Sequence, residues 1–401
     1  MNAPDTNALD LAALAQRYGR GFAVNLPDEV VQLKHEVRRF IEAEVEPRSR
    51  EIEEADAVPE VLLQMSRELG LFGLTIPEQY GGIGLDLAGK CAIEEELGRT
   101  NYGWATIIAN HTGISTKGIV DLGNEAQKRH YLPRMATGEW LGSFALTEPQ
   151  AGSDPAAMRT TAVKRGDRWI LNGEKIYITN APSAHVFTVM AVTDRTQGAK
   201  GISAFIVERG FPGLSVGPNE RKMGMHGCGT APVIMQDCEV PAANLLGPEG
   251  LGYVQALKTL TSGRVTVAAR CCGIMDRLIE RTIDYLKTRE QGGRRIADYQ
   301  GLQWMLADMA LARDASRLLV QRAIDVIRSG ARGTVEASMA KLHATEAAGR
   351  VADAAIQLHG GIGYMRDFGI ETMARDVRIT RIYEGTSEIQ RSLIARELLK
   401  D

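Results

Sequence analysis

Four polar or glycine-rich stretches carry residue types that can take part in chemistry, either a carboxylate that could act as a base or glycines whose N–H groups could approach phosphate. LTEPQAGSD (146–154) is explained as a surface turn, and EKIYITNA (174–181) as a sandwich strand. QLHGGIGYMRD (357–367) follows a long helical pattern, where a glycine pair commonly ends a helix. RIYEGTSEIQ (381–390) sets Glu384 before a glycine and two hydroxyl residues, and Thr386 or Ser387 could simply cap the next helix.

Several common site motifs are missing from the chain. No GxGxxG follows a strand and opens a helix, and no GxxxxGK[ST] occurs, which disfavours Rossmann and P-loop proteins. The 7 histidines are scattered without an HExxH, so no metal site is expected, and no GxSxG marks a serine nucleophile.

Composition narrows the class of protein further. The 401 residues suggest two or three domains, and a net charge of -3 argues against a nucleic-acid protein and against a polybasic membrane-surface protein. The 5 cysteines form no CxxC pair, which favours a reducing compartment. The N-terminus MNAPDTNALDLAAL lacks a presequence pattern, and no apolar run approaches the ~20 residues of a membrane span. We therefore expect a soluble, cytoplasmic protein with no membrane span.

The elements that must position these stretches fall into three zones. Residues 1–141 have apolar residues at helical spacing and predict an α-helical domain. Residues 142–250 contain short β-branched and aromatic runs separated by turn residues, which predicts an antiparallel sandwich or small barrel. Residues 251–401 predict a C-terminal four-helix bundle, made of three long amphipathic segments and a fourth at 387–401. The fold class is α+β multidomain.

In this order and layout the stretches resemble the acyl-CoA dehydrogenase family over 28–400. The resemblance rests on PEQYGGIGLD, FALTEPQAGSD, NGEKIYITNA, KMGMHGCGTAPVIMQDCEVPAANLLG, Arg289 ahead of DYQ, QLHGGIGYMRD and RIYEGTSEIQR. It implies binding of FAD and assembly as a homotetramer, a dimer of dimers. It also implies an acyl-CoA substrate, desaturated to a trans-2-enoyl-CoA in fatty acid or amino acid catabolism, with an electron-transfer flavoprotein as acceptor.

Members of the family remove a proton from Cα of the thioester and transfer a hydride from Cβ to flavin N5. A base must therefore lie beside Cα. The resemblance assigns this role to Glu384, whose pKa burial should raise. Some branches of the family carry the glutamate on the first long C-terminal helix, where this chain has Gly263.

The resemblance also implies the binding residues. Within one chain, those expected to hold FAD are Phe144, Leu146, Thr147, Ser153, Tyr177, Ile178, Thr179, Thr386 and Glu388. Those expected to reach a neighbour's FAD are Arg289, Gln300, Gln357, Gly360 and Gly361. Those expected on the substrate side are Ser153, Arg264, Tyr383 and Gly385.

Two departures and three alternatives accompany the resemblance. Tyr177 stands where many relatives carry Trp; since a Tyr can still stack, a changed flavin environment with retained binding is expected. Gly292 replaces an aromatic residue, so packing near the adenine is expected to be looser. An acyl-CoA oxidase that uses oxygen is the near alternative. FAD-binding relatives that are not dehydrogenases, including a DNA-binding type that the net charge of -3 opposes, and a purely structural helical protein are the others.

The helix GRTNYGWATIIANHTG (98–113) is expected, by resemblance, to line the bottom of the acyl cavity. Its bulky residues are Tyr102, Trp104, Ile107 and Ile108, of which Trp104 and Ile108 share one face. If that face meets the substrate, the pocket takes short, branched, cyclic or at most medium acyl chains.

Overall fold

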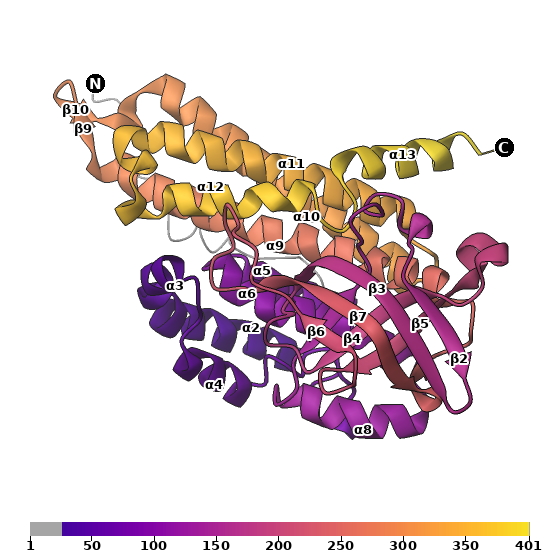
Figure 1. Ribbon diagram of the computed structural model, residues 1–401. Coiled ribbons are helices and arrows are strands. Elements are labelled where there is room, and N and C mark those ends of the chain that lie inside the picture. The colour runs from indigo at the N-terminus through magenta and orange to yellow at the C-terminus, as the bar shows by residue number, and fades with distance from the viewer. Residues whose placement is uncertain (1–25, 401) are drawn as a thin grey trace.

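The structure is a computed structural model that describes residues 26–400. The expectation about an N-terminal presequence concerns residues outside this range. Helical N-terminal residues and a β-sheet lie side by side, and long C-terminal helices run across both (Figure 1). The predicted fold class is therefore confirmed, although the sheet and the bundle differ from the prediction in detail. None of the helices within 26–400 combines the length and apolar composition of a membrane span.

The N-terminal helices enclose one strongly buried helix, α5 (Leu87–Leu97). Asp86 caps α5 by accepting a hydrogen bond from the Gly89 N–H at 2.9 Å. Every residue from Ala88 to Leu97 is buried, because α5 lies between α2 and the C-terminal helix α9 (Gly252–Thr288). The other helices of this region are α2 (Asp28–Phe40), α3 (Ser49–Ala55), α4 (Glu60–Glu68), α6 (Tyr102–Asn110), α7 (Thr116–Leu122) and α8 (Glu125–Ala136).

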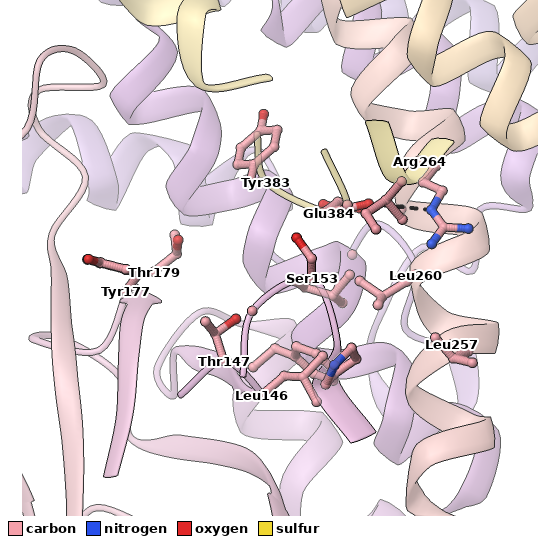
Figure 2. Close-up of a pocket in the computed structure, with 18 of the residues that line it drawn as sticks. Leu146, Thr147, Ser153, Tyr177, Thr179, Leu257, Leu260, Arg264, Tyr383 and Glu384 are labelled. Carbon is pink, nitrogen blue, oxygen red and sulfur yellow. Dashed lines mark hydrogen bonds between the residues drawn. The ribbon is translucent and has the colours of Figure 1, made fainter. Parts of the chain in front are cut away.

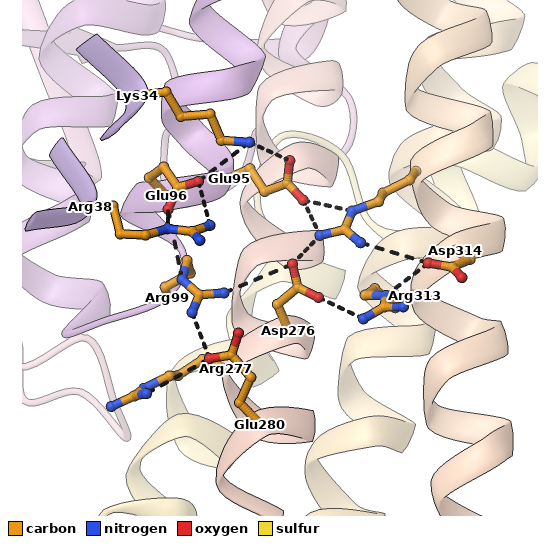
Figure 3. Close-up of polar contacts among 11 residues, drawn as sticks. Lys34, Arg38, Glu95, Glu96, Arg99, Asp276, Arg277, Glu280, Arg313 and Asp314 are labelled. Carbon is orange, nitrogen blue, oxygen red and sulfur yellow. Dashed lines mark hydrogen bonds and ion pairs between the residues drawn. The ribbon is translucent and has the colours of Figure 1, made fainter. Parts of the chain in front are cut away.

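Buried charges on α5 are compensated across the domain boundary (Figure 3). The Arg38 Nε of α2 lies 2.8 Å from Glu96 Oε2, and the Arg317 Nε of α10 (Gln300–Arg328) lies 2.6 Å from Glu95 Oε1. Asp276 of α9 continues the network to Arg313 at 2.9 Å. Removing one partner of such a buried pair typically costs about 3–5 kcal/mol, so this network fixes α5 against the C-terminal helices.

The middle region is a mixed sheet, whereas the sequence predicted an antiparallel one. Strand β1 (Gly142–Ala145) pairs parallel to β4 (Val186–Val192), and β2 (Thr161–Arg165) meets β4 in parallel at Thr161 and Val192. Parallel neighbours need a long crossover, and the segment between β1 and β4 supplies it. The remaining strands are antiparallel: β3 (Arg168–Thr179), β5 (Ile202–Glu208), β6 (Leu214–Val216), β7 (Thr230–Pro241) and β8 (Leu245–Leu246).

Strand β3 joins two runs, RWILNG and EKIYITNA, that the sequence suggested as separate strands. A bulge at Gly173 makes this possible, since Gly173 has a φ of +150° and a Cβ there would lie 2.3 Å from Thr160 Oγ1. The continuous strand carries Tyr177 and Thr179 from the sheet to the C-terminal helices.

The C-terminal bundle contains α9, α10, α11 (Thr334–His359) and a fourth helix that the sequence analysis did not predict. This fourth helix is α12 (Ile370–Arg378), which packs on α9 and α11. The predicted fourth helix, α13 (Ser387–Leu398), instead packs on α11 and projects from the opposite end of the bundle (Figure 1). The short, arginine-rich α12 lacked a long hydrophobic pattern, and its helical face is set by packing.

Candidate active site

A cavity of about 490 Å³ lies where the sheet, α6, α9 and the loop before α13 meet (Figure 2). Phe144, Leu146, Thr147, Tyr177, Ile178 and Thr179 enter it from β1, its following loop and β3, and Ser153 enters from the next turn. Arg264 of α9 and the loop residues Tyr383, Glu384 and Gly385 close it. The structure therefore brings together residues that the sequence analysis assigned to the cofactor and to the substrate.

Glu384 occupies a strained position in the loop before α13. Its φ is +53° and that of Gly385 is +91°, so two consecutive residues adopt the left-handed region. Three side chains hold this turn through its carbonyl groups. Arg264 Nε donates to Glu384 O at 3.4 Å, Lys341 Nζ donates to Gly385 O at 2.7 Å, and Gln390 Nε2 donates to Gly385 O at 2.9 Å.

The Glu384 carboxyl lies in a buried environment that alters its protonation. Its Oε2 atom is buried and has no hydrogen-bond partner among the described residues. Burial raises the pKa of Glu384 to about 7, although the nearby cations Arg270, Lys341 and Arg264 oppose the shift. A carboxylate with this pKa can take up a proton near neutral pH.

Gly263 on α9 provides the space in which that carboxylate lies. A Cβ added at Gly263 would stand 2.3 Å from Glu384 Oε2 and 3.2 Å from the Ile114 Cγ2 atom. Positions 263 and 384 therefore face the same point, although the sequence separates them widely.

A buried ion pair that the sequence analysis missed fixes the strand ends. Lys175 Nζ lies 2.7 Å from Glu148 Oε1 and donates to Leu146 O at 3.2 Å. Lys175 and the hydrogen bonds from Thr160 and Arg159 outweigh burial and lower the pKa of Glu148 to about 2. Both residues stand inside LTEPQAGSD and EKIYITNA, but only the fold brings the two stretches together.

Other lining residues were also missed, and many of them belong to helical stripes. On α9 the stripe is Tyr253, Leu257, Leu260 and Arg264, and from α6 onward it is Thr106, Ala109, Asn110 and Gly113. This spacing of three and four residues is the signal that could have found them. Further lining residues come from α13: Ile389, Ser392, Leu393 and Arg396.

Trp104 and Ile108 do not line the cavity, so the condition under which they would limit the acyl chain is not met, and the alternative that their face packs in the core holds. Both side chains are fully buried in the N-terminal core, where Trp104 Nε1 donates to Ser66 Oγ at 3.1 Å. They occupy the face of α6 opposite Thr106 and Asn110, because the large apolar side chains pack against α4 and its neighbours.

We expect Trp104→Ala to lower the free energy of unfolding by about 3–5 kcal/mol, the usual cost of a buried aromatic deletion. Urea denaturation measures this loss. The preferred acyl chain length should stay the same, since the side chain lies away from the cavity. A shift of the optimum to longer chains would show that Trp104 is the wall after all.

Thr386 and Glu388 lie beside the cavity rather than in its lining. Thr386 caps α13 by accepting from the Ile389 N–H at 3.3 Å, as the local explanation of this stretch allowed. The Glu388 side chain is 80% exposed in the first turn of α13.

The residues expected to reach a neighbour's FAD lie at the end of the bundle that is far from Glu384. Gly360 follows Lys341 by 19 positions along α11, and Arg289 follows Gly263 by 26 along α9. At 1.5 Å per residue these separations are about 28 and 39 Å. Stacking of Tyr285 on His359, with centroids 4.6 Å apart, joins the two helix ends. The group there, all exposed, is Arg289, Gln300, Gln357, Gly360 and Gly361.

Gly292 lies in a tight hairpin at this end. Gly292 and Gly293 have φ values of +60° and +77° and connect β9 (Glu290–Gln291) to β10 (Arg294–Arg295). Two consecutive positive φ values are what a two-residue hairpin turn requires. The glycines thus satisfy a backbone requirement at the position where the resemblance expected an aromatic side chain.

Comparisons with known proteins identify the class. The chain matches family models described as acyl-CoA dehydrogenase N-terminal domain over 27–139, middle domain over 143–238 and C-terminal domain over 250–399. The chain therefore belongs to the acyl-CoA dehydrogenase family, and it is an FAD-dependent oxidoreductase.

Similar proteins match over nearly their whole length. An acyl-CoA dehydrogenase of Bacillus subtilis is 43% identical over 94% of this chain and 99% of its own. Butyryl-CoA dehydrogenase from Megasphaera elsdenii is 36% identical, covers 94% and 100%, and superposes with a TM-score of 0.91. A chain of the structure described as "Electron transferring flavoprotein of Acidaminococcus fermentans: Towards a mechanism of flavin-based electron bifurcation" is 41% identical, covers 94% and 99%, and has a TM-score of 0.91.

The residues that face the cavity suit a flavin. The Tyr177 residue is 63% exposed, which leaves ring surface available to stack on another planar ring. A Cβ at Gly152 would meet nothing within 4 Å, so the turn beside Ser153 leaves room for a ligand. Gly360 and Gly361 at the far end likewise have open space around them, which is what a pyrophosphate-binding backbone needs.

Proposed function

We propose that the protein desaturates an acyl-CoA thioester between Cα and Cβ, with Glu384 as the base that removes the α-proton. The observation that carries the proposal is the buried, unpartnered Oε2 of Glu384 inside the cavity shared by the strand ends and α9. FAD, when bound, supplies the acceptor for the hydride from Cβ at its N5 atom.

The chain's own residues prepare the proton transfer. Arg264, Lys341 and Gln390 hold the carbonyl groups of the turn, so the carboxylate keeps one orientation toward the cavity. The raised pKa makes ionised Glu384 a stronger base than an exposed glutamate. Ser153, Arg264, Tyr383 and Gly385 line the route by which the thioester would reach it.

The residues with which one chain holds its own FAD are Phe144, Leu146, Thr147, Ser153, Tyr177, Ile178 and Thr179, with Thr386 and Glu388 beside them. All but the last two line the cavity. Tyr177 takes the stacking role that Trp has in many relatives.

A second copy completes the FAD site in this proposal. The far-end group that includes Arg289 and Gln357 lies too far from Glu384 to serve the same cavity in one chain. The outer face of α10 also carries Trp304, Leu311 and Leu318, which are 62%, 69% and 72% exposed at intervals of seven residues. Such a stripe suits helix packing between copies, and we propose the homotetramer, a dimer of dimers, as the assembly.

We expect Arg289→Ala to weaken FAD binding by about ten-fold or more, the usual effect of losing a charge-assisted hydrogen bond to phosphate. Fluorescence titration of the apoprotein with FAD measures this change, and light scattering measures the accompanying loss of assembly. Arg295→Ala is the matched control, since Arg295 lies in the same hairpin and its nearest carboxylate is Asp298 at 3.4 Å. A monomer that binds FAD normally would contradict the shared site.

The electron acceptor decides between dehydrogenase and oxidase. We propose an electron-transfer flavoprotein, supported by the similarity to a chain in the Acidaminococcus fermentans structure and to butyryl-CoA dehydrogenase. Reoxidation of the substrate-reduced enzyme should be fast with an electron-transfer flavoprotein and slow with dissolved oxygen, as stopped-flow absorbance at the flavin band can show. The reverse order would establish the oxidase.

A further inference from the structure

The acyl cavity continues into a second, smaller chamber of about 180 Å³. Gly113, Gly263 and Thr266 line both spaces, so the two are neighbours behind Glu384. The smaller chamber lies between α5, the π-helical turn His111–Ser115 after α6, and α9, and Lys90 and Thr112 are among the residues that line it. Gly113 leaves this junction open, because a Cβ there would meet nothing within 4 Å.

Two buried cations that line these cavities share one carboxylate. Arg270, which lines the larger cavity, lies with its Nε 2.8 Å from Glu94 Oε2. Lys90, which lines the smaller one, lies with its Nζ 2.9 Å from Glu94 Oε1. Exposed fractions are only 2% for Lys90, 0% for Glu94 and 5% for Arg270. Burial lowers the pKa of Lys90 and the neighbouring Glu94 opposes that shift; with Lys90 charged, two positive charges against one negative leave an excess positive charge in the interior.

The donors of these cations are not all used. Lys90 Nζ donates to Thr112 Oγ1 and forms an ion pair with Glu94 Oε1, which leaves at least one of its three N–H groups without an acceptor. Arg270 uses Nε and, weakly, Nη1 toward Thr106 Oγ1 at 3.4 Å, while Nη2 has no partner within residues 26–400. A buried cation without a matching anion is costly, so a ligand that brings an anion to these cations would be favoured.

The other charged groups nearby do not remove the excess. Glu95 and Glu96 pair with Arg317 and Arg38 in the interdomain network (Figure 3). Asp86 also lines the smaller chamber, but it caps α5 and lies 3.5 Å from Arg328, while Lys117 pairs with Asp121 at 3.0 Å. Glu384 adds a negative charge only when it is ionised, and Arg270, Lys341 and Arg264 then all face it, so the single carboxylate of Glu384 does not balance these three cations.

We propose that Lys90 and Arg270 form a subsite for a carboxylate at the far end of the acyl group, so that the preferred substrate is a CoA thioester of a dicarboxylic acid. The inference rests on the proposed function, because it places the acyl chain past Glu384. The terminal carboxylate accepts hydrogen bonds from the free N–H groups of the two cations, and Glu94 holds both cations in place.

The test compares acyl-CoA pairs of equal length, with and without the terminal carboxylate: glutaryl with pentanoyl, adipyl with hexanoyl, and suberyl with octanoyl. We expect kcat/KM of the holoenzyme, with an artificial acceptor, to favour the carboxylated member of at least one pair by about ten-fold or more. Calorimetric binding of the corresponding CoA thioethers, which have no thioester carbonyl, should show the same preference without turnover.

Lys90→Met should lower that preference by about ten-fold, both in kcat/KM and in thioether binding, because the substitution keeps the length and removes the charge. Glu94 stays paired with Arg270 in this variant, so the fold is retained. Lys117→Met is the matched control, since Lys117 lines the same chamber but pairs with Asp121, and its preference should stay within two-fold of the unmodified protein.

A preference for the unsubstituted chain in all three pairs overturns the inference while leaving the proposed function intact. A preference for carboxylated chains that Lys90→Met leaves unchanged overturns the assignment of the subsite. Failure of every acyl-CoA to reduce the flavin refutes the proposed function itself.

Discussion

Glu384→Gln should retain FAD and lower turnover by at least about 100-fold, because the amide keeps the shape of the side chain and removes its basicity. The amide is uncharged and fills the same buried position, so we expect no loss of thermal stability above pH 7, where the native carboxylate is ionised in a buried site. Steady-state rates with an artificial acceptor measure the turnover, and the flavin absorbance of the purified variant measures the retention of FAD.

The predicted pH dependence of kcat/KM follows from the role of Glu384 as a base. A base works only when deprotonated, so kcat/KM of the unmodified enzyme should rise with pH through about 7, where Glu384 loses its proton. Glu397→Gln, on the exposed end of α13, should leave both rate and pH profile as they are. Near-normal turnover of Glu384→Gln would refute the assignment of the base.

Moving the carboxylate to α9 should produce the second large effect. Gly263→Glu combined with Glu384→Gly should restore part of the activity that Glu384→Gly alone abolishes, because a Cβ at position 263 would stand 2.3 Å from the native Oε2, so a carboxylate carried from there enters the same space. Recovery of about ten-fold over the single variant would be clear above background. Turnover numbers under identical conditions, with FAD content measured for each protein, provide the comparison.

The single variant Gly263→Glu is the necessary control for the double variant. It crowds two carboxyl groups into one site, where even a Cβ would stand 2.3 Å from Glu384 Oε2, so it should be nearly inactive. If the double variant is as inactive as Glu384→Gly while binding FAD normally, positions 263 and 384 do not address the same Cα.

The sequence was sufficient for features that repeat along the chain or stand in contiguous motifs. Helical spacing and β-branched runs predicted the three regions, and the stretches around Thr147, Tyr177 and Glu384 contain residues that the fold brings to one cavity. Features that depend on distant partners were not predictable. The Lys175 ion pair with Glu148 exists only because β3 crosses the loop after β1.

The orientation of a helix was the other feature that the sequence could not predict. The pattern of residues 102–110 shows that Trp104 and Ile108 share a face, but it does not say whether that face meets the ligand or the core. The core takes the large side chains, and the cavity takes Thr106, Ala109 and Asn110. Helix α12 was missed for a related reason, because nine residues with two arginines carry too little local signal without their packing partners.

Anaerobic mixing of the FAD-loaded protein with acyl-CoA tests the central claim most directly. Using the best substrate of the six-member panel, we expect bleaching of the flavin band with one trans-2-enoyl-CoA formed per flavin, and bleaching slower by at least about 100-fold in Glu384→Gln. A flavin that stays oxidised with all six thioesters, or that bleaches equally fast in both proteins, would contradict the account.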